Sequence, residues 1–148
     1  AELMQAMASA GPVGAIEVCR TRAPAIAAHV GNEAGVRVSR TALRVRNGAN
    51  APDEATRAVL EDFAARLGEG AAPETLEHFE ARPGGGARYL KAIVMQPPCL
   101  ACHGEAIAGP VRRALAEHYP ADAATGFAVG DLRGAVLVEW PAHPEDVP

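Results

Sequence analysis

The chain has 148 residues, of which 49% are hydrophobic and 4% aromatic, and its formal net charge is −4. This length predicts one domain over residues 1–148, and a negative chain gives no basis for nucleic-acid binding. No run of about 18 apolar residues is present, so we expect no membrane-spanning segment. Residues 1–12 and 141–148 are expected to be extended or flexible tails.

The first predicted element is a helix over residues 12–30. Pro12 suits a first helical turn, because the amide hydrogen that proline lacks would have no partner there. Alanine dominates this segment, and Ala15 and Ala23 lie four residues on either side of Cys19, on the same helical face. Small residues around one sulfur allow a flat group to approach closely. A homodimer formed through this apolar helix is an alternative that the sequence leaves open.

Residues 35–46 alternate partly between apolar and polar types, which is the period of a strand. A cationic cluster lies within this segment: Arg37, Arg40, Arg44 and Arg46. The default interpretation of such a cluster is a solvated strand face.

A turn cluster over residues 47–53 follows, and Asp53 at its end is expected to open a helix that runs to about residue 67. The helix has a regular apolar stripe. Its members are Val59, Leu60, Phe63 and Leu67.

The second half of the chain adds strands to this pattern. Residues 76–81 and 88–94 are predicted strands, joined by a glycine-rich hairpin loop over residues 82–86. A helix over residues 111–118 and a strand over residues 134–140 follow. This order predicts an α+β fold in which helices pack on an antiparallel sheet.

Between the hairpin and the later helix stands Cys99-Leu100-Ala101-Cys102-His103, which has the C-x-x-C-H pattern of covalent haem c attachment. Two thiols at this spacing add to the two vinyl groups of the porphyrin, and the next residue supplies the proximal imidazole. A thioredoxin-type motif would begin a helix directly after a strand and does not need the histidine. A zinc ribbon needs a second C-x-x-C, and the chain has one further cysteine.

The motif therefore predicts one covalently bound haem c, with thioethers at Cys99 and Cys102 and His103 as proximal axial ligand. Arg40 and Arg46 are the candidates for contacting its propionates, because a guanidinium binds carboxylates well. Haem c is matured outside the cytoplasm, and the opening Ala1-Glu2-Leu3 looks like a terminus left by signal cleavage. We therefore expect a periplasmic or otherwise exported bacterial protein.

The residues alone leave several candidates for the sixth iron ligand. Cys19 has no intrachain disulfide partner if the other two cysteines form thioethers, and its ordinary interpretation is a small buried hydrophobic residue. Histidine or methionine is the usual sixth ligand in cytochromes c. The competitors of Cys19 are Met4, Met7, Met95, His29, His78, His118 and His143.

The chain also resembles a family of single-haem cytochrome c domains with a PAS-like fold, which occur alone and as sensory modules. The resemblance covers about residues 13–138. It rests on residues 15–19, 23–27, 40–43, 46–53, 99–104, 119–127 and 130–135. One departure is Gly48, which stands where the family has a proline after Arg-Asn. The family implies a curved antiparallel sheet flanked by helices, His103 as proximal ligand and Cys19 as distal ligand.

A His/Cys iron would have no open position, and a thiolate ligand favours Fe(III), which gives a low reduction potential. These properties favour one-electron transfer to a redox partner protein over catalysis, and no catalytic residue is assigned. A haem-based redox or gas sensor is the alternative that the PAS-like resemblance suggests. An enzyme of sulfur-compound oxidation is a further alternative, by analogy of its cysteine ligation.

Overall fold

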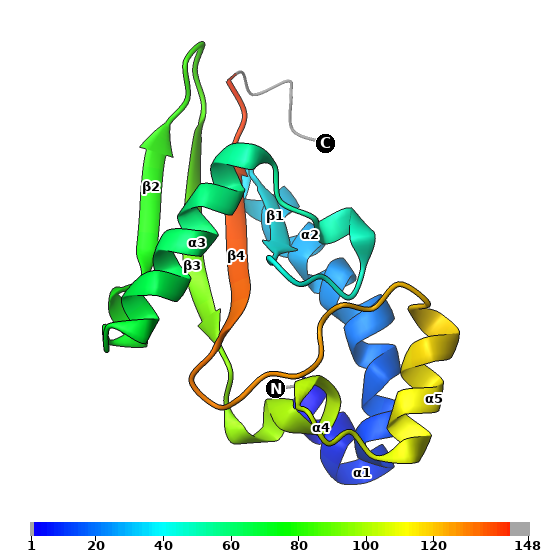
Figure 1. Cartoon of the computed structure of the whole chain (residues 1–148). Coiled ribbons are helices and arrows are strands. Elements are labelled where there is room, and N and C mark those ends of the chain that lie inside the picture. The colour runs from blue at the N-terminus through cyan, green and yellow to red at the C-terminus, as the bar shows by residue number, and fades with distance from the viewer. Residues whose placement is uncertain (1, 143–148) are drawn as a thin grey trace.

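The computed structural model describes residues 2–142 and has an α+β fold (Figure 1). Its four-stranded antiparallel sheet has the order β1-β4-β3-β2. The strands are β1 (Arg37–Thr41), β2 (Glu77–Ala81), β3 (Ala87–Val94) and β4 (Leu132–Trp140). This arrangement confirms the predicted fold class, and a sheet flanked by helices is consistent with a PAS-like fold.

The helix α3 (Glu54–Gly68) covers one face of the sheet (Figure 1). The Asp53 carboxylate caps its first turn and accepts a hydrogen bond of 2.7 Å from the Thr56 amide, as the turn cluster predicted. Leu60 and Phe63 of the predicted stripe are fully buried. They form the main core with three residues of the sheet side: Leu76, Leu90 and Ala135.

The N-terminal segment forms an interrupted helix beside the other face of the sheet. Its parts are α1 (Glu2–Glu17), the π-helical turn η1 (Val18–Arg22) and α2 (Ala23–Ala34). The expected tail over residues 1–12 is wrong for the described residues 2–12, because they belong to α1. Gly11 interrupts α1 with a φ of 67°, so a new helical stretch begins at Pro12, where the sequence placed a helix start. No helix within residues 2–142 has the length and apolarity needed to cross a membrane.

The strand predicted over residues 35–46 is shorter than expected, because β1 ends at Thr41. Beyond it, arginine side chains bind carbonyl groups of other loops instead of lying on a strand face. Arg44 donates to the Thr125 carbonyl at 2.9 Å, and Arg46 binds the residues described below. These contacts pull the segment away from the sheet.

A second layer lies below the sheet in Figure 1, where the short α4 (Leu100–His103) and α5 (Gly109–His118) meet α1. The sequence predicted α5 but not α4. Ile16 of α1 packs on apolar residues of α5 and the loop before it: Ile107, Val111 and Leu115. Three 3-10 turns complete the described elements: η2 (Gly48–Asn50), η3 (Pro73–Thr75) and η4 (Pro97–Cys99). Of the predicted C-terminal tail, residues 143–148 lie outside the described residues.

Candidate functional site

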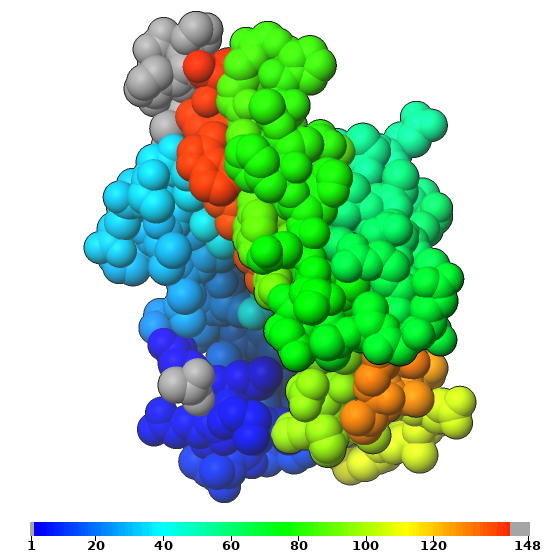
Figure 2. Space-filling model, turned by 90° about the vertical axis from the view of Figure 1, so that its left-hand side faces the viewer, coloured from blue at the N-terminus to red at the C-terminus, as the bar shows by residue number. Residues whose placement is uncertain are grey.

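A cavity of about 840 Å³ opens between the N-terminal helices and the sheet. Figure 2 shows the surface hollowed where the blue and cyan helices face the strands. This volume lies in the range of roughly 300–1,000 Å³ that is usual for ligand and cofactor sites. Four residues singled out from the sequence share its wall: Cys19, Cys99, Cys102 and His103. The fold thus brings the first helical segment against the C-x-x-C-H motif.

The C-x-x-C-H motif occupies one compact helical turn. The chain passes from η4 into α4, so Cys99 and Cys102, three residues apart, lie on neighbouring positions of one helical face. Both thiols are partly exposed to the cavity. The turn ends at Gly104, where a Cβ atom would lie 2.8 Å from the Leu100 carbonyl oxygen. Only glycine allows the chain to turn away this closely after the histidine.

The His103 ring is oriented by a hydrogen bond to the backbone. Its Nδ1 lies 2.7 Å from the Ala124 carbonyl oxygen, and because a carbonyl only accepts, Nδ1 carries the hydrogen. This leaves the lone pair of Nε2 free to bind a metal. Burial lowers the pKa of His103 to about 4, with Arg133 and Arg46 adding to the effect. The imidazole is therefore neutral at physiological pH, which is the form that ligates iron.

The distal candidate, Cys19, lies in the π-helical turn η1 and is exposed at the cavity. The Ala23 amide donates to the Val18 carbonyl, five residues back, and Pro24 has no amide hydrogen with which to restore the α-helical ladder. Such turns are rare and occur often at functional sites. Ala15 and Ala23 also line the cavity, as expected for one face of small residues around this sulfur.

The predicted arginines occupy different surroundings. Arg40 is exposed on β1 and lines the cavity. The partly buried Arg46 also lines it, but its Nε donates to Asp122 at 2.9 Å and its Nη2 to the Cys102 carbonyl at 2.5 Å. Arg46 therefore connects the motif turn to the loop that holds the His103 hydrogen bond through Ala124. Contact of Arg40 or Arg46 with a propionate stays a prediction.

Arg133 also lines the cavity, and the residue patterns did not single it out. Ile93 pairs with Gly134 and Val94 with Leu132, so Arg133 is the extra residue of a β-bulge in β4. Bulges often redirect a side chain next to a functional site. The pKa of Arg133 falls to about 10 because of burial and nearby positive charge.

Gly134 was the sequence signal for this bulge, because a glycine inside a strand marks a bulge or a close approach. Its φ is 153°, and a Cβ atom there would lie 2.3 Å from the Thr41 carbonyl oxygen. The strands β1 and β4 therefore meet at the cavity wall only with glycine at this position.

Of the other candidates for the sixth iron ligand, the fold places only some on the cavity wall. Met4 and Met7 of α1 join Cys19 on the cavity wall. Met95 is fully buried in a small cluster with Ala124 and Phe127. Three histidines are outside that wall: His29, His78 and His118. A further candidate, at position 143, lies outside the described residues.

Comparison with known proteins gives a family and a solved structure. The Tll0287-like family model, described as Tll0287, matches residues 2–141. The crystal structure of the cyanobacterial haem protein Tll0287 is similar, with a TM-score of 0.64 and 31% sequence identity. The match covers 80% of this chain and 68% of that chain. No protein of curated function matches the chain.

Proposed function

The chain belongs to the Tll0287-like family, and on this premise we propose that it is a single-haem c-type cytochrome. Cys99 and Cys102 would form the two thioethers, with His103 and Cys19 as the axial ligands. The observation that carries the proposal is the shared cavity, whose wall contains all four residues. The similarity to a solved haem protein supports it independently.

The cavity wall fits a haem in its chemistry. Two thiols lie on one helical face, and the neutral His103 presents a free Nε2 because Ala124 holds its Nδ1. Apolar side chains of α1 and α5, such as Ile16 and Leu115, line the cavity and would cover a porphyrin face. Arg40 and Arg133 supply positive charge at the wall, where propionates need it. A haem bound there would supply a one-electron iron couple.

The ligand set favours electron transfer at low potential. With His103 on one side and Cys19 on the other, the protein leaves no axial position for a substrate. A thiolate donor stabilises the ferric state relative to a His/Met pair. We therefore propose a low-potential carrier that exchanges one electron with a partner protein. Covalent haem attachment also supports an exported, periplasmic location.

Covalent attachment is tested by the mass of the denatured protein after expression with haem c maturation. We expect a mass increase of one haem in the wild-type chain, and loss of it in the Cys99→Ser, Cys102→Ser double variant. A wild-type protein that stays colourless, or whose haem is extracted by acidic solvent, would overturn the proposal.

The distal ligand is tested by ferric electron paramagnetic resonance and ultraviolet–visible spectra. The wild-type protein should give a low-spin His/thiolate signature, which the Cys19→Ala variant should lose. His29→Ala is the matched control, because His29 is an exposed side chain of α2 outside the cavity wall. An unchanged spectrum in Cys19→Ala would assign the sixth position to another residue, with Met4 and Met7 the next to test.

A sensor is the second candidate function, and the position of Cys19 favours it. This residue lies in an exposed π-helical turn, and such local structure opens at low cost. If reduction weakened the bond to the Cys19 thiolate, this exposed sulfur would take up a proton from solvent, and the sixth position would then be open to a small gas. The reduced protein should then change its Soret band with CO at neutral pH. Fast reduction by a donor protein without any CO response would leave electron transfer as the function.

A further inference from the structure

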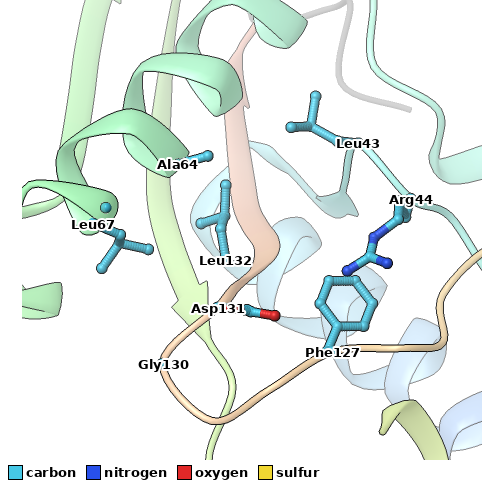
Figure 3. A pocket seen from close by; sticks show the side chains of 9 residues that line it. Leu43, Arg44, Ala64, Leu67, Phe127, Gly130, Asp131 and Leu132 are labelled. Atoms are coloured by element: carbon cyan, nitrogen blue, oxygen red, sulfur yellow. The ribbon is translucent and has the colours of Figure 1, made fainter. Parts of the chain in front are cut away.

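A second, smaller cavity lies between α3 and the loop that precedes β4, and Figure 3 shows it from close by. Its volume is about 490 Å³, which is sufficient for a small metabolite. The aliphatic part of its wall comes from α3, the start of β4 and the loop after β1. Four residues form this part: Leu43, Ala64, Leu67 and Leu132. None of them lines the larger cavity.

Two opposite charges face this second cavity from different walls. Arg44 stacks on the Phe127 ring, with its guanidinium carbon 3.6 Å from the ring centroid, and its Nη1 donates to the Thr125 carbonyl. Asp131 accepts a hydrogen bond of 2.8 Å from the Ala128 amide through Oδ2.

Both residues are exposed, so their outer polar atoms are open to solvent. Within residues 2–142, Nε and Nη2 of Arg44 and Oδ1 of Asp131 have no hydrogen-bond partner. The same part of the chain shows no ion pair between Arg44 and Asp131. A cation donor and a carboxylate acceptor are thus held apart by backbone contacts, above an aliphatic surface.

We propose that this cavity binds a free α-amino acid with a branched aliphatic side chain. Arg44 would bind the α-carboxylate, and Asp131 would bind the α-ammonium group, each by a charge-assisted hydrogen bond. The aliphatic side chain would lie on Leu67 and Leu132. A simple carboxylate would meet the unpaired Asp131, and a simple amine would meet Arg44, so both are disfavoured.

The cavity is also connected to the proposed haem site through Phe127. The Phe127 and His103 ring centroids are 6.3 Å apart at an interplanar angle of 85°, and the Phe127 amide donates to the His103 carbonyl at 3.0 Å. A ligand packed against Phe127 would therefore change the surroundings of the proximal imidazole. This step, unlike the binding itself, rests on the proposed function.

Binding is tested by calorimetry on the full chain with three probes. L-leucine should bind, whereas 4-methylpentanoate and 3-methylbutylamine, which each lack one charged group, should bind at least about tenfold more weakly, a loss of about 1.4 kcal/mol. Absence of L-leucine binding, or equal binding of all three probes, would overturn the proposal.

Two variants locate the site. Ala64→Leu fills the cavity and should abolish L-leucine binding, whereas Ala65→Leu, an exposed neighbour outside the cavity, should preserve it. Asp131→Asn should weaken the binding of L-leucine but not that of 4-methylpentanoate. This substitution leaves the apolar wall of the cavity unchanged. Equal affinity in wild type and Ala64→Leu would place the ligand elsewhere and refute the site.

A Soret shift on adding L-leucine would support the connection through Phe127, and binding without any shift would refute that connection while leaving the site intact. Because calorimetry does not depend on colour, a protein without haem would refute the proposed cytochrome and still decide this site.

Discussion

Among single residues, Arg46 shows how one side chain stabilises the local geometry of the candidate site. Its guanidinium is largely buried and pairs with the similarly buried Asp122 at 2.9 Å, the two side chains being 12% and 11% exposed. It also binds the Cys102 carbonyl, and more distantly the Ala124 carbonyl at 3.3 Å. The motif turn and the loop that orients His103 are thus held by the same cation.

We expect Arg46→Gln to destabilise the protein by about 3 kcal/mol, because it leaves the largely buried Asp122 carboxylate without its counter-charge. Urea unfolding of the haem-loaded protein measures this. Arg66→Gln is the control, since Arg66 pairs with Asp62 at the surface and should cost about 0.5 kcal/mol or less. Equal losses in the two variants would contradict this role for Arg46.

The reduction potential should depend on the sulfur at position 19. In Cys19→Met a neutral thioether replaces the proposed thiolate, so the ferric state loses stabilisation and the potential should rise. We expect a change on the order of 100 mV or more, within the roughly 0.8 V over which axial ligands move haem potentials. Spectroelectrochemical titration measures it. An unchanged potential would show that Cys19 does not ligate the iron.

Residue types at fixed spacing were readable from the sequence, whereas long-range contacts were not. The C-x-x-C-H motif identifies its own chemistry, and the face of small residues around Cys19 followed from helical period. Arg133 was missed because its position depends on a one-residue bulge against β3. The partners of Arg46 lie 56 and 76 residues along the chain, and no local pattern indicates them.

At the scale of elements, Asp53 determines where α3 begins. Its carboxylate accepts hydrogen bonds from Thr56, and its pKa is held below the ordinary value of 3.8, first by these hydrogen bonds and then by the charge of Arg88. The folded chain therefore binds this proton less tightly than the unfolded chain. The resulting stabilisation is complete above the ordinary pKa and is lost as the pH falls through the lower, folded value.

Asp53→Ala should accordingly cost about 1 kcal/mol at pH 7, the usual effect of losing an N-cap. The difference between wild type and variant should shrink as the pH falls below about 4, because the wild-type carboxylate then becomes protonated. Thermal unfolding from pH 7 to below pH 4 measures the loss of stability at neutral pH and its decrease in acid. Glu61→Ala, at an exposed position inside the same helix, should be close to neutral throughout.

Element types were predicted more reliably than their ends. The α3 stripe and the hairpin strands β2 and β3 lie where period and turn residues placed them, because each depends on local spacing. The β1 strand ends early since Arg44 and Arg46 find carbonyl partners outside the sheet. The helix before Pro12 was missed because Pro12 was interpreted as a first helical turn, whereas α1 begins at Glu2 and continues past an interruption at Gly11.

For the whole molecule, the main hydrophobic core and the larger cavity are formed by different residues. The main core under α3 contains Leu60, Phe63 and Leu90, and none of its buried residues lines the larger cavity. The N-terminal helices, by contrast, contribute much of that cavity wall. Their packing therefore depends on what fills the space between them and the sheet.

Without haem, we expect α1, η1 and α2 to open locally while α3 keeps its structure, because the former contribute much of the larger cavity wall and α3 contributes none of it. Hydrogen–deuterium exchange of the Cys99→Ser, Cys102→Ser variant against the loaded wild type measures this by segment. Amides of residues 2–34 should exchange much faster in the variant, and those of residues 54–68 should change little. Uniform acceleration over both segments would instead mean that the haem and the sheet share one cooperative core.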